Sequence, residues 1–169
     1  MVLGSGLIMP KVTINSIDHF LQQLNQLGAD VEKIAEKAVY AGAGIMADEY
    51  RATIEALPID NRFGTEGNPR RGVTEAEKKG LLDGLGITPI TNDNGYINAK
   101  IGFDGYNDNK TEKWPKGKPN QMVARAINSG TSFSEKMPFA DTANQRGRTR
   151  ARKRMVEITE EEIDKILKG

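Results

Sequence analysis

IDHFLQQLNQLGADVEKIAEKAVYAGAGIMADEYRATIEAL, residues 17–57, is the stretch that decides the fold. Its apolar residues recur at alternating steps of four and three, which places them on one face of a helix. They are Phe20, Leu24, Leu27, Val31, Ile34, Ala38, Ala41 and Ile45. This heptad-like spacing favours packing against a second helix, and Pro58 ends the helical pattern. Gly28, followed by Asp30 as a candidate N-cap, predicts a break into two helices.

Small residues dominate the centre of this helix, from Tyr40 to Ala47 (YAGAGIMA). Glycine inside a helix costs roughly 1 kcal/mol relative to alanine, so Gly42 and Gly44 are expected where another backbone approaches closely. Two interpretations are open. The favoured one is close packing against the protein's own sheet. The other is a helix–helix contact between subunits, which makes Gly42 and Gly44 candidate interface residues.

Shorter elements surround this helix. Residues 11–17 alternate apolar and polar side chains, which predicts a short strand. A polar loop at 58–74 follows the helix. Thr74 and Glu77 have the spacing of a capping box, which predicts a helix that begins at Glu75 and ends near Gly86.

A β-hairpin is predicted next, because Asn94-Gly95 is typical of a type I′ turn. In the segment after it, 96–103, apolar and polar residues alternate, so one face should be buried. Pro89 places the first strand at an edge or in a bulge. The remaining elements are a second polar loop at 104–120, a short helix or strand at 121–128, and a last helix at 139–167 with a candidate interruption at Gly147.

These elements predict an α+β fold, in which a long N-terminal helix and a C-terminal helix pack on a small antiparallel β-sheet. Residues 11–169 are expected to form a single domain with the two long loops. Residues 1–10 predict a flexible leader without the basic start of a secretory signal, and the native start is either Met1 or Met9.

Composition excludes several classes of function. The 169 residues carry 24 Lys+Arg and 23 Asp+Glu, so no whole-protein field attracts nucleic acid or membrane. There is no cysteine, which excludes disulfides and thiolate zinc sites. No stretch of the sequence is long and apolar enough to cross a bilayer, so we expect no membrane partner.

The sequence offers no catalytic constellation. Its one histidine, His19, has no neighbours that suit a triad or a metal site. The glycines from Gly80 to Gly86 lack the lysine and the spacing of a phosphate loop. Carboxylates are plentiful on helices but lack a polar cluster that would raise a pKa. We therefore expect no enzyme activity, no cofactor and no metal ion.

The last helix is electrically divided. Its basic residues are Arg146, Arg148, Arg150, Arg152, Lys153 and Arg154, and its acidic residues are Glu157, Glu160, Glu161, Glu162 and Asp164. This order opposes the helix dipole. Three interpretations are open, in order of preference: a solvated face, a subunit interface in which basic and acidic halves of two copies meet, and a DNA-facing surface. For the second, all of these residues except Lys153 and Glu162 are candidate interface residues.

The order of several short motifs resembles a known family. After the long helix comes Ala56-Leu-Pro-Ile-Asp60, then Asn128-Ser-Gly-Thr-Ser132, then Met137-Pro-Phe-Ala-Asp141. The chain from Lys11 to Leu167 resembles the gene-10-like tail-completion or head–tail joining proteins of long-tailed bacteriophages, similar in role to the minor tail protein Z of lambda. It departs from the family in two ways. The insertion 61–72 displaces the usual Thr-Gly-x-Leu motif, for which Gly80-Leu-Leu-Asp-Gly84 can stand in, and the loop at 104–120 is long.

The resemblance implies a structural virion protein of a phage or prophage that assembles as a ring at the head–tail junction. Its expected partners are further copies of itself and the tail-tube, tail-terminator or head-connector proteins, with passing contact with DNA. Its expected location is the neck and tail of the virion, and the host cytoplasm during assembly. The alternative function is a nucleic-acid-binding accessory protein that uses the basic segment Arg146–Arg154.

Overall fold

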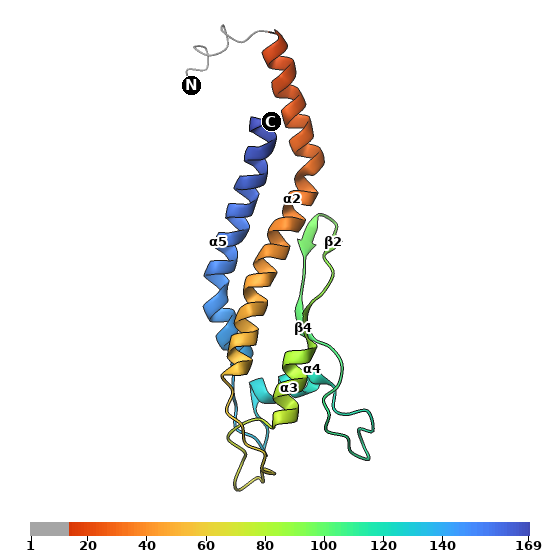
Figure 1. Ribbon diagram of the computed structural model, residues 1–169, viewed down its shortest axis with the longest axis vertical. Helices are drawn as coiled ribbons and strands as arrows, with labels where there is room; N and C mark the ends of the chain where they lie inside the picture. Colours follow the sequence, from red (N-terminus) through yellow and green to blue (C-terminus); the bar gives the residue numbers. More distant parts are fainter. Residues whose placement is uncertain (1–13) are drawn as a thin grey trace.

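The computed structural model describes the backbone of residues 14–169 and the side chains from residue 25 onward. The elements in chain order are α2 (Ile14–Glu55), α3 (Glu75–Gly84), β1 (Leu85–Ile87), β2 (Thr91–Asp93), β3 (Tyr96–Asn98), β4 (Ile101–Phe103), α4 (Asn120–Ser129) and α5 (Phe139–Lys168). This confirms the predicted α+β class. Figure 1 shows an elongated molecule in which α2 and α5 form a two-helix arm above a more compact base.

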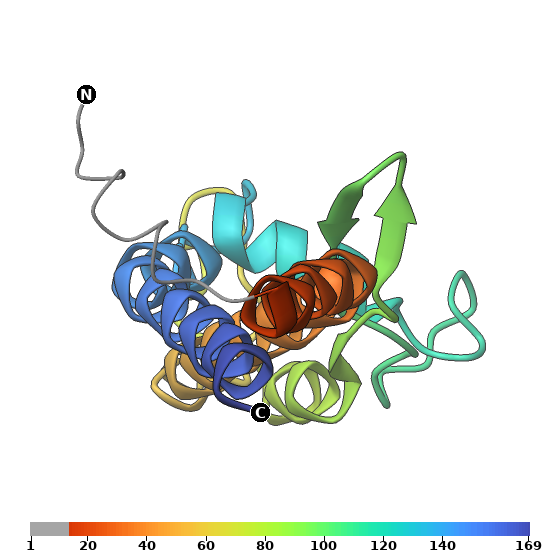
Figure 2. The ribbon, with the colours of Figure 1, turned by 90° about the horizontal axis from the view of Figure 1, so that it is seen from above.

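The arm consists of α2 and α5, which run antiparallel and in contact along most of α5 (Figures 1 and 2). Ile34 and Ala38 of α2 are buried in it, as are Ala143 and Ala151 of α5. This confirms the prediction from the heptad-like pattern that α2 packs against a second helix.

Two predicted helix breaks are wrong. Helix α2 passes through Gly28 without interruption, and the carboxylate of Asp30 accepts a hydrogen bond from the side chain of Gln26 at 2.5 Å instead of capping a new helix. Helix α5 likewise passes through Gly147. Because extended helix packing stabilises both helices, one glycine does not end either of them.

The predicted strand at 11–17 is wrong where the structure describes it. Residues 14–17 are the first turn of α2, whereas residues 11–13 and the predicted leader (1–10) lie outside the described residues. The physical reason is spacing: Ile14 and Ile17 are three residues apart, so the helical apolar stripe extends back to them as well as the strand pattern does.

The base holds the hydrophobic core. It is built from the end of α2, from Leu57 and Val73 in the connection to α3, and from helices α3, α4 and α5. Its fully buried side chains are Ile54, Val73 and Leu81. The Phe103 and Phe139 rings pack against each other, edge to face, with 6.0 Å between centroids, and Tyr50 contacts both. Helix α3 begins with the predicted capping box. Thr74 Oγ1 accepts from the Glu77 backbone N–H at 3.1 Å, and the Glu77 carboxylate accepts from the Thr74 backbone N–H at 2.9 Å.

The predicted hairpin is present but divided into two short antiparallel ladders. Strand β1 pairs with β4 next to the base, and β2 pairs with β3 at the tip. Asn94 and Gly95 have φ of 56° and 91°, as a type I′ turn requires. The ladders separate around Pro89, which has no N–H to donate. The tip is held to α2 by a bond of 2.6 Å from the Asn92 side chain to Glu32.

Candidate subunit interface

Gly42 lies where α2 packs closely against α5. A Cβ atom added there would lie 2.7 Å from both Cγ and Sδ of Met155, well inside van der Waals contact. Gly147 plays the same part on α5, since an added Cβ would lie 2.6 Å from Sδ of Met46. The close packing expected at Gly42 is therefore within the chain, and its partner is α5, so the expected packing against the sheet is wrong.

Gly44 is different, because an added Cβ would meet nothing within 4 Å. No contact in the described part of the chain accounts for a glycine there. Its role in a subunit interface stays a prediction.

Several charges of α5 are used within the chain. Arg150 pairs with Glu49 of α2. Arg154 pairs with Glu157 at 3.2 Å and with Glu161 at 3.4 Å. The Arg150–Glu49 pair joins the two helices of the arm, whereas the Arg154 pairs lie within α5, and each pair contributes little in water.

Glu162 bridges the two helices of the arm. Its carboxylate accepts hydrogen bonds from Lys165 and from Lys37 of α2, both at 2.6 Å. The bond from Lys165 and then the one from Lys37 hold the pKa of Glu162 below its ordinary value.

Other charges of α5 face solvent. Arg146, Arg148, Arg152 and Lys153 are exposed, and no ion pair holds them among the described side chains. Glu160 is also exposed and unpaired within the same set. The expected conflict with the helix dipole is reduced at the helix ends, because Asp141 lies in the first turn and Lys165 and Lys168 lie in the last.

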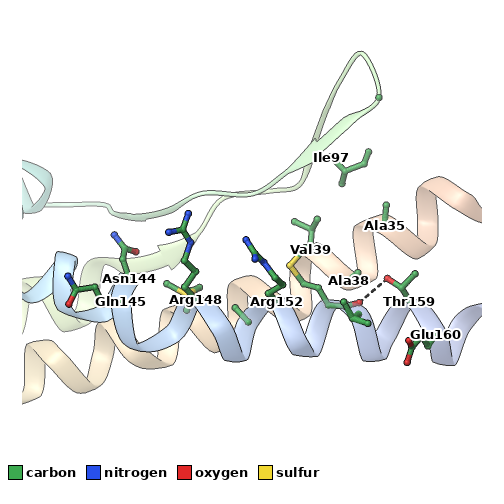
Figure 3. Close-up of a pocket in the computed structure, with 15 residues that line it drawn as sticks. Ala35, Ala38, Val39, Ile97, Asn144, Gln145, Arg148, Arg152, Thr159 and Glu160 are labelled. Atoms are coloured by element: carbon green, nitrogen blue, oxygen red, sulfur yellow. Dashed lines mark hydrogen bonds between the residues drawn. The ribbon is translucent and has the colours of Figure 1, made fainter.

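A groove of about 1200 Å³ runs along the α2–α5 seam beneath the hairpin tip. Its apolar lining is Ala35, Ala38, Val39, Met46, Ile97, Ala151, Met155 and Val156. On the α5 side, Arg148 and Arg152 point toward the hairpin (Figure 3). The sequence does not predict this groove, because its walls come from three segments that are distant along the chain.

The loop at 58–74 is tethered to the base. Asp60 accepts bonds from Arg62 Nε at 2.9 Å and from the Arg71 backbone at 3.0 Å, and these hold the pKa of its carboxyl far below the usual range. Arg70 pairs with Glu77 at 2.8 Å, with both side chains largely buried. The loop therefore offers a fixed surface.

The loop at 104–120 is held from within by Asn107, which is only 2% exposed. Its side-chain oxygen accepts from the backbone N–H groups of Asn109 at 3.1 Å and Lys118 at 3.0 Å. Between the two loops lies a hollow of about 1140 Å³ whose lining includes Phe63 and Phe133. Phe63 is fully exposed and Phe133 is 59% exposed. Phenylalanines in polar loops were the sequence signal for this second surface.

The described residues contain no cluster of three or more His, Cys, Asp or Glu side chains that could hold a metal ion. Within the same part of the chain, no helix combines the length and the apolar character that crossing a membrane requires. The side chain of His19 lies outside the described residues.

Comparison with known proteins finds no family model, no curated protein and no solved structure that matches the chain.

Proposed function

We propose that the chain is a structural virion protein of a phage or prophage that assembles as a ring at the head–tail junction. The observation that carries this proposal is the order of the three motifs, together with their meeting in one place. Leu57 of the first motif and Phe139 of the third belong to the same core cluster. Motifs that meet in one part of the core support a shared fold. The same motifs scattered over the surface would support it less.

The middle motif, 128–132, contacts the third motif in the same part of the base. The side-chain oxygen of Asn128 accepts hydrogen bonds from the backbone N–H groups of Ala140 at 3.0 Å and Asp141 at 3.4 Å, so it caps the start of α5. The Met137 backbone N–H donates to Ile127 at 2.9 Å. Asn128 thereby links α4 to the third motif, Met137–Asp141.

In the proposed mechanism, the arm and the base have different tasks. Copies associate around the ring through exposed faces of α2 and α5, including the open side of Gly44. The tethered loops at 58–74 and 104–120 contact tail-tube, tail-terminator or head-connector proteins. Phe63 of the first loop and Phe133, in the connection between α4 and α5, are the apolar anchors. Because the bonds of Asp60, Arg70 and Asn107 already hold the two loops, ordering the loops on binding costs little entropy, which favours such contacts.

Size-exclusion chromatography with light scattering tests this function. The chain is expected to form oligomers, alone at high concentration or when mixed with the neck and tail proteins encoded beside it. A strict monomer under both conditions would contradict the proposal.

Nucleic-acid binding is the second candidate, favoured by four exposed basic side chains of α5 that form no ion pair with any side chain from residue 25 onward. If Arg146, Arg148, Arg152 and Lys153 each neutralise one phosphate, log K should fall with log salt with a slope of about −3 to −4. Replacing Arg148 and Arg152 with Ala should reduce the slope by about 2, whereas Arg150→Ala, at a residue paired with Glu49, should change it less. Absence of salt-dependent DNA binding by the wild-type chain would exclude this candidate.

A further inference from the structure

The hollow between the loops at 58–74 and 104–120 has one apolar side. Helix α4 supplies it, with Met122, Val123, Ala126 and Ile127. Val123 and Ile127 also belong to the buried core, so this side is the bottom of the hollow. Phe63 and Phe133 line the hollow as well, and both of these rings are exposed. The hollow therefore offers an apolar surface that only a binding partner would cover.

Lysines line the side of the hollow that the loop at 104–120 forms. They are Lys110, Lys113 and Lys118, and none of them forms an ion pair with any side chain from residue 25 onward. Asp108, in the same loop, does not neutralise them, because it pairs with Lys79 at 3.6 Å. This side of the hollow is therefore positively charged.

The other charged residues of the lining are mostly paired within the chain. Arg62 pairs with Asp60 at 2.8 Å, and Arg70 pairs with Glu77 at 2.8 Å. Glu75 is the remaining acid of the described lining, and it forms no ion pair with a described side chain. The charges left to a partner are therefore three lysines and one glutamate.

The backbone that carries the lysines is held in a fixed shape. The backbone N–H groups of Thr111 and Trp114 each donate to the carbonyl oxygen of the other, at 3.0 and 2.9 Å. The Gly117 N–H donates to Trp114 at 3.0 Å. Lys113 Nζ lies 5.9 Å from the centroid of the Trp114 ring, which also lines the hollow. The lysines are thus presented by ordered backbone, so a partner need not order it.

We propose that the hollow binds an acidic segment of a partner protein that also carries an apolar side chain. The apolar side chain packs against Phe63, Phe133 and the α4 side of the hollow, and its burial supplies the affinity. Carboxylates beside it pair with the three lysines. Because these lysines lie on one side of the hollow, they also fix the orientation of the segment.

This inference rests on the proposed function, in which tail or connector proteins contact the two loops. It adds the chemistry by which that surface recognises them. The partner segment must combine Asp or Glu with Leu, Ile, Phe or Trp, and a basic segment would be repelled by the lysines.

Single-stranded nucleic acid also binds surfaces that combine lysines with aromatic rings. Two observations favour a protein segment. The apolar side that α4 supplies suits an apolar side chain and offers no partner to a phosphate, and Glu75 in the same lining repels phosphates. The chain as a whole, with 24 Lys+Arg and 23 Asp+Glu, adds no general attraction for nucleic acid.

Selection from a random-peptide library against the whole chain tests the chemistry without assuming a sequence. The enriched peptides are expected to be acidic and to contain large apolar residues. Absence of enrichment, or enrichment of basic peptides or of apolar peptides without Asp and Glu, would overturn the proposal.

Fluorescence anisotropy with a labelled peptide from this selection tests the lysine side of the hollow. Lys113→Glu turns attraction into repulsion and should weaken binding about fivefold or more. Lys116→Glu is the matched control, because Lys116 is an exposed lysine of the same loop that does not line the hollow, so it should change the affinity much less. Equal effects of the two reversals would contradict binding in the hollow.

The same assay tests the apolar side. Phe63→Ser should weaken binding about tenfold, as loss of an anchor residue does. Tyr96→Ser, at a residue that is 71% exposed on the hairpin and does not line the hollow, should not change it. Single-stranded oligothymidylate is the competing probe. If it binds more tightly than the acidic peptides and Lys113→Glu abolishes this binding, the hollow is a nucleic-acid site and the proposal is wrong.

These measurements use the chain alone, so they separate the two proposals. A chain that assembles with neck and tail proteins but shows no preference for acidic peptides would remove only the inference about the hollow. A chain that binds acidic peptides but stays monomeric under all conditions would remove only the proposed ring.

Discussion

Gly42 and Gly44 lie two residues apart on the same helix, yet their surroundings predict opposite effects of a single added methyl group. In Gly44→Ala the methyl group meets nothing within 4 Å. Only the backbone effect remains, so this variant should be about 0.5–1 kcal/mol more stable than wild type.

Gly42→Ala has the same backbone gain but places its methyl group 2.7 Å from Cγ and Sδ of Met155. Overpacking of this kind costs about 1–3 kcal/mol, and a flexible methionine keeps it toward the lower end. The two alanine variants should therefore differ by about 1–3 kcal/mol, with Gly42→Ala the less stable. Both residues lie inside α2, so both variants gain the same backbone stabilisation. This gain cancels when the free energies of unfolding of the two variants are compared.

Guanidinium chloride unfolding followed by circular dichroism measures both variants. Adding Met155→Ala to Gly42→Ala removes the clash, so the two substitutions should couple in a double-mutant cycle. Equal stability of the Gly42 and Gly44 variants, or no coupling with Met155, would refute the close packing of α2 on α5. If Gly44→Ala impairs oligomers while raising stability, the predicted interface at Gly44 is supported.

Three other predictions concern stability and one concerns binding. Ile54→Ala should cost about 2–5 kcal/mol, because Ile54 is fully buried, and denaturant unfolding checks this. Thr74→Ala should cost about 0.5–2 kcal/mol in the same assay through loss of the capping box. The pKa of Glu162 is lowered in the folded state from its ordinary 4.5, so its contribution is complete above pH 4.5 and is lost as the pH falls below it. Wild type should therefore lose more stability than Glu162→Gln between pH 7 and pH 3 in thermal unfolding; equal losses would contradict this. Phe63→Ser should leave stability within about 0.5 kcal/mol, because Phe63 is fully exposed, but weaken co-elution with a tail or connector partner.

Local signals in the sequence predicted the local structure well. The Thr74/Glu77 capping box and the Asn94-Gly95 turn are present as expected, because short-range hydrogen bonds and backbone conformation decide them. The long apolar stripe likewise predicted α2 and its helical partner.

The roles of the helix glycines depend on tertiary contacts, which the sequence alone does not reveal. From the sequence alone, Gly147 predicts a helix break. In the structure Gly147 instead packs closely against Met46, because the fold brings α2 alongside α5. Helix propensity alone also does not distinguish Gly42, which is packed against α5, from Gly44, which faces open space.

The candidate interface was predictable in part. The division of charge along α5 is visible in the sequence, but which charges are already paired within the chain is not. Arg150 and Glu162 are engaged by Glu49 and Lys37 of α2, whereas Arg152 and Glu160 are left exposed. That distinction depends on which face of α5 meets α2, and the spacing of charges alone does not determine it.

Immunogold electron microscopy of phage particles purified from an induced culture of the strain that carries the gene tests the central claim most directly. The proposed function predicts gold label at the head–tail junction of intact particles, and on tails or heads separated at that point. Abundant chain in the lysate together with its absence from purified particles would contradict a structural role in the virion.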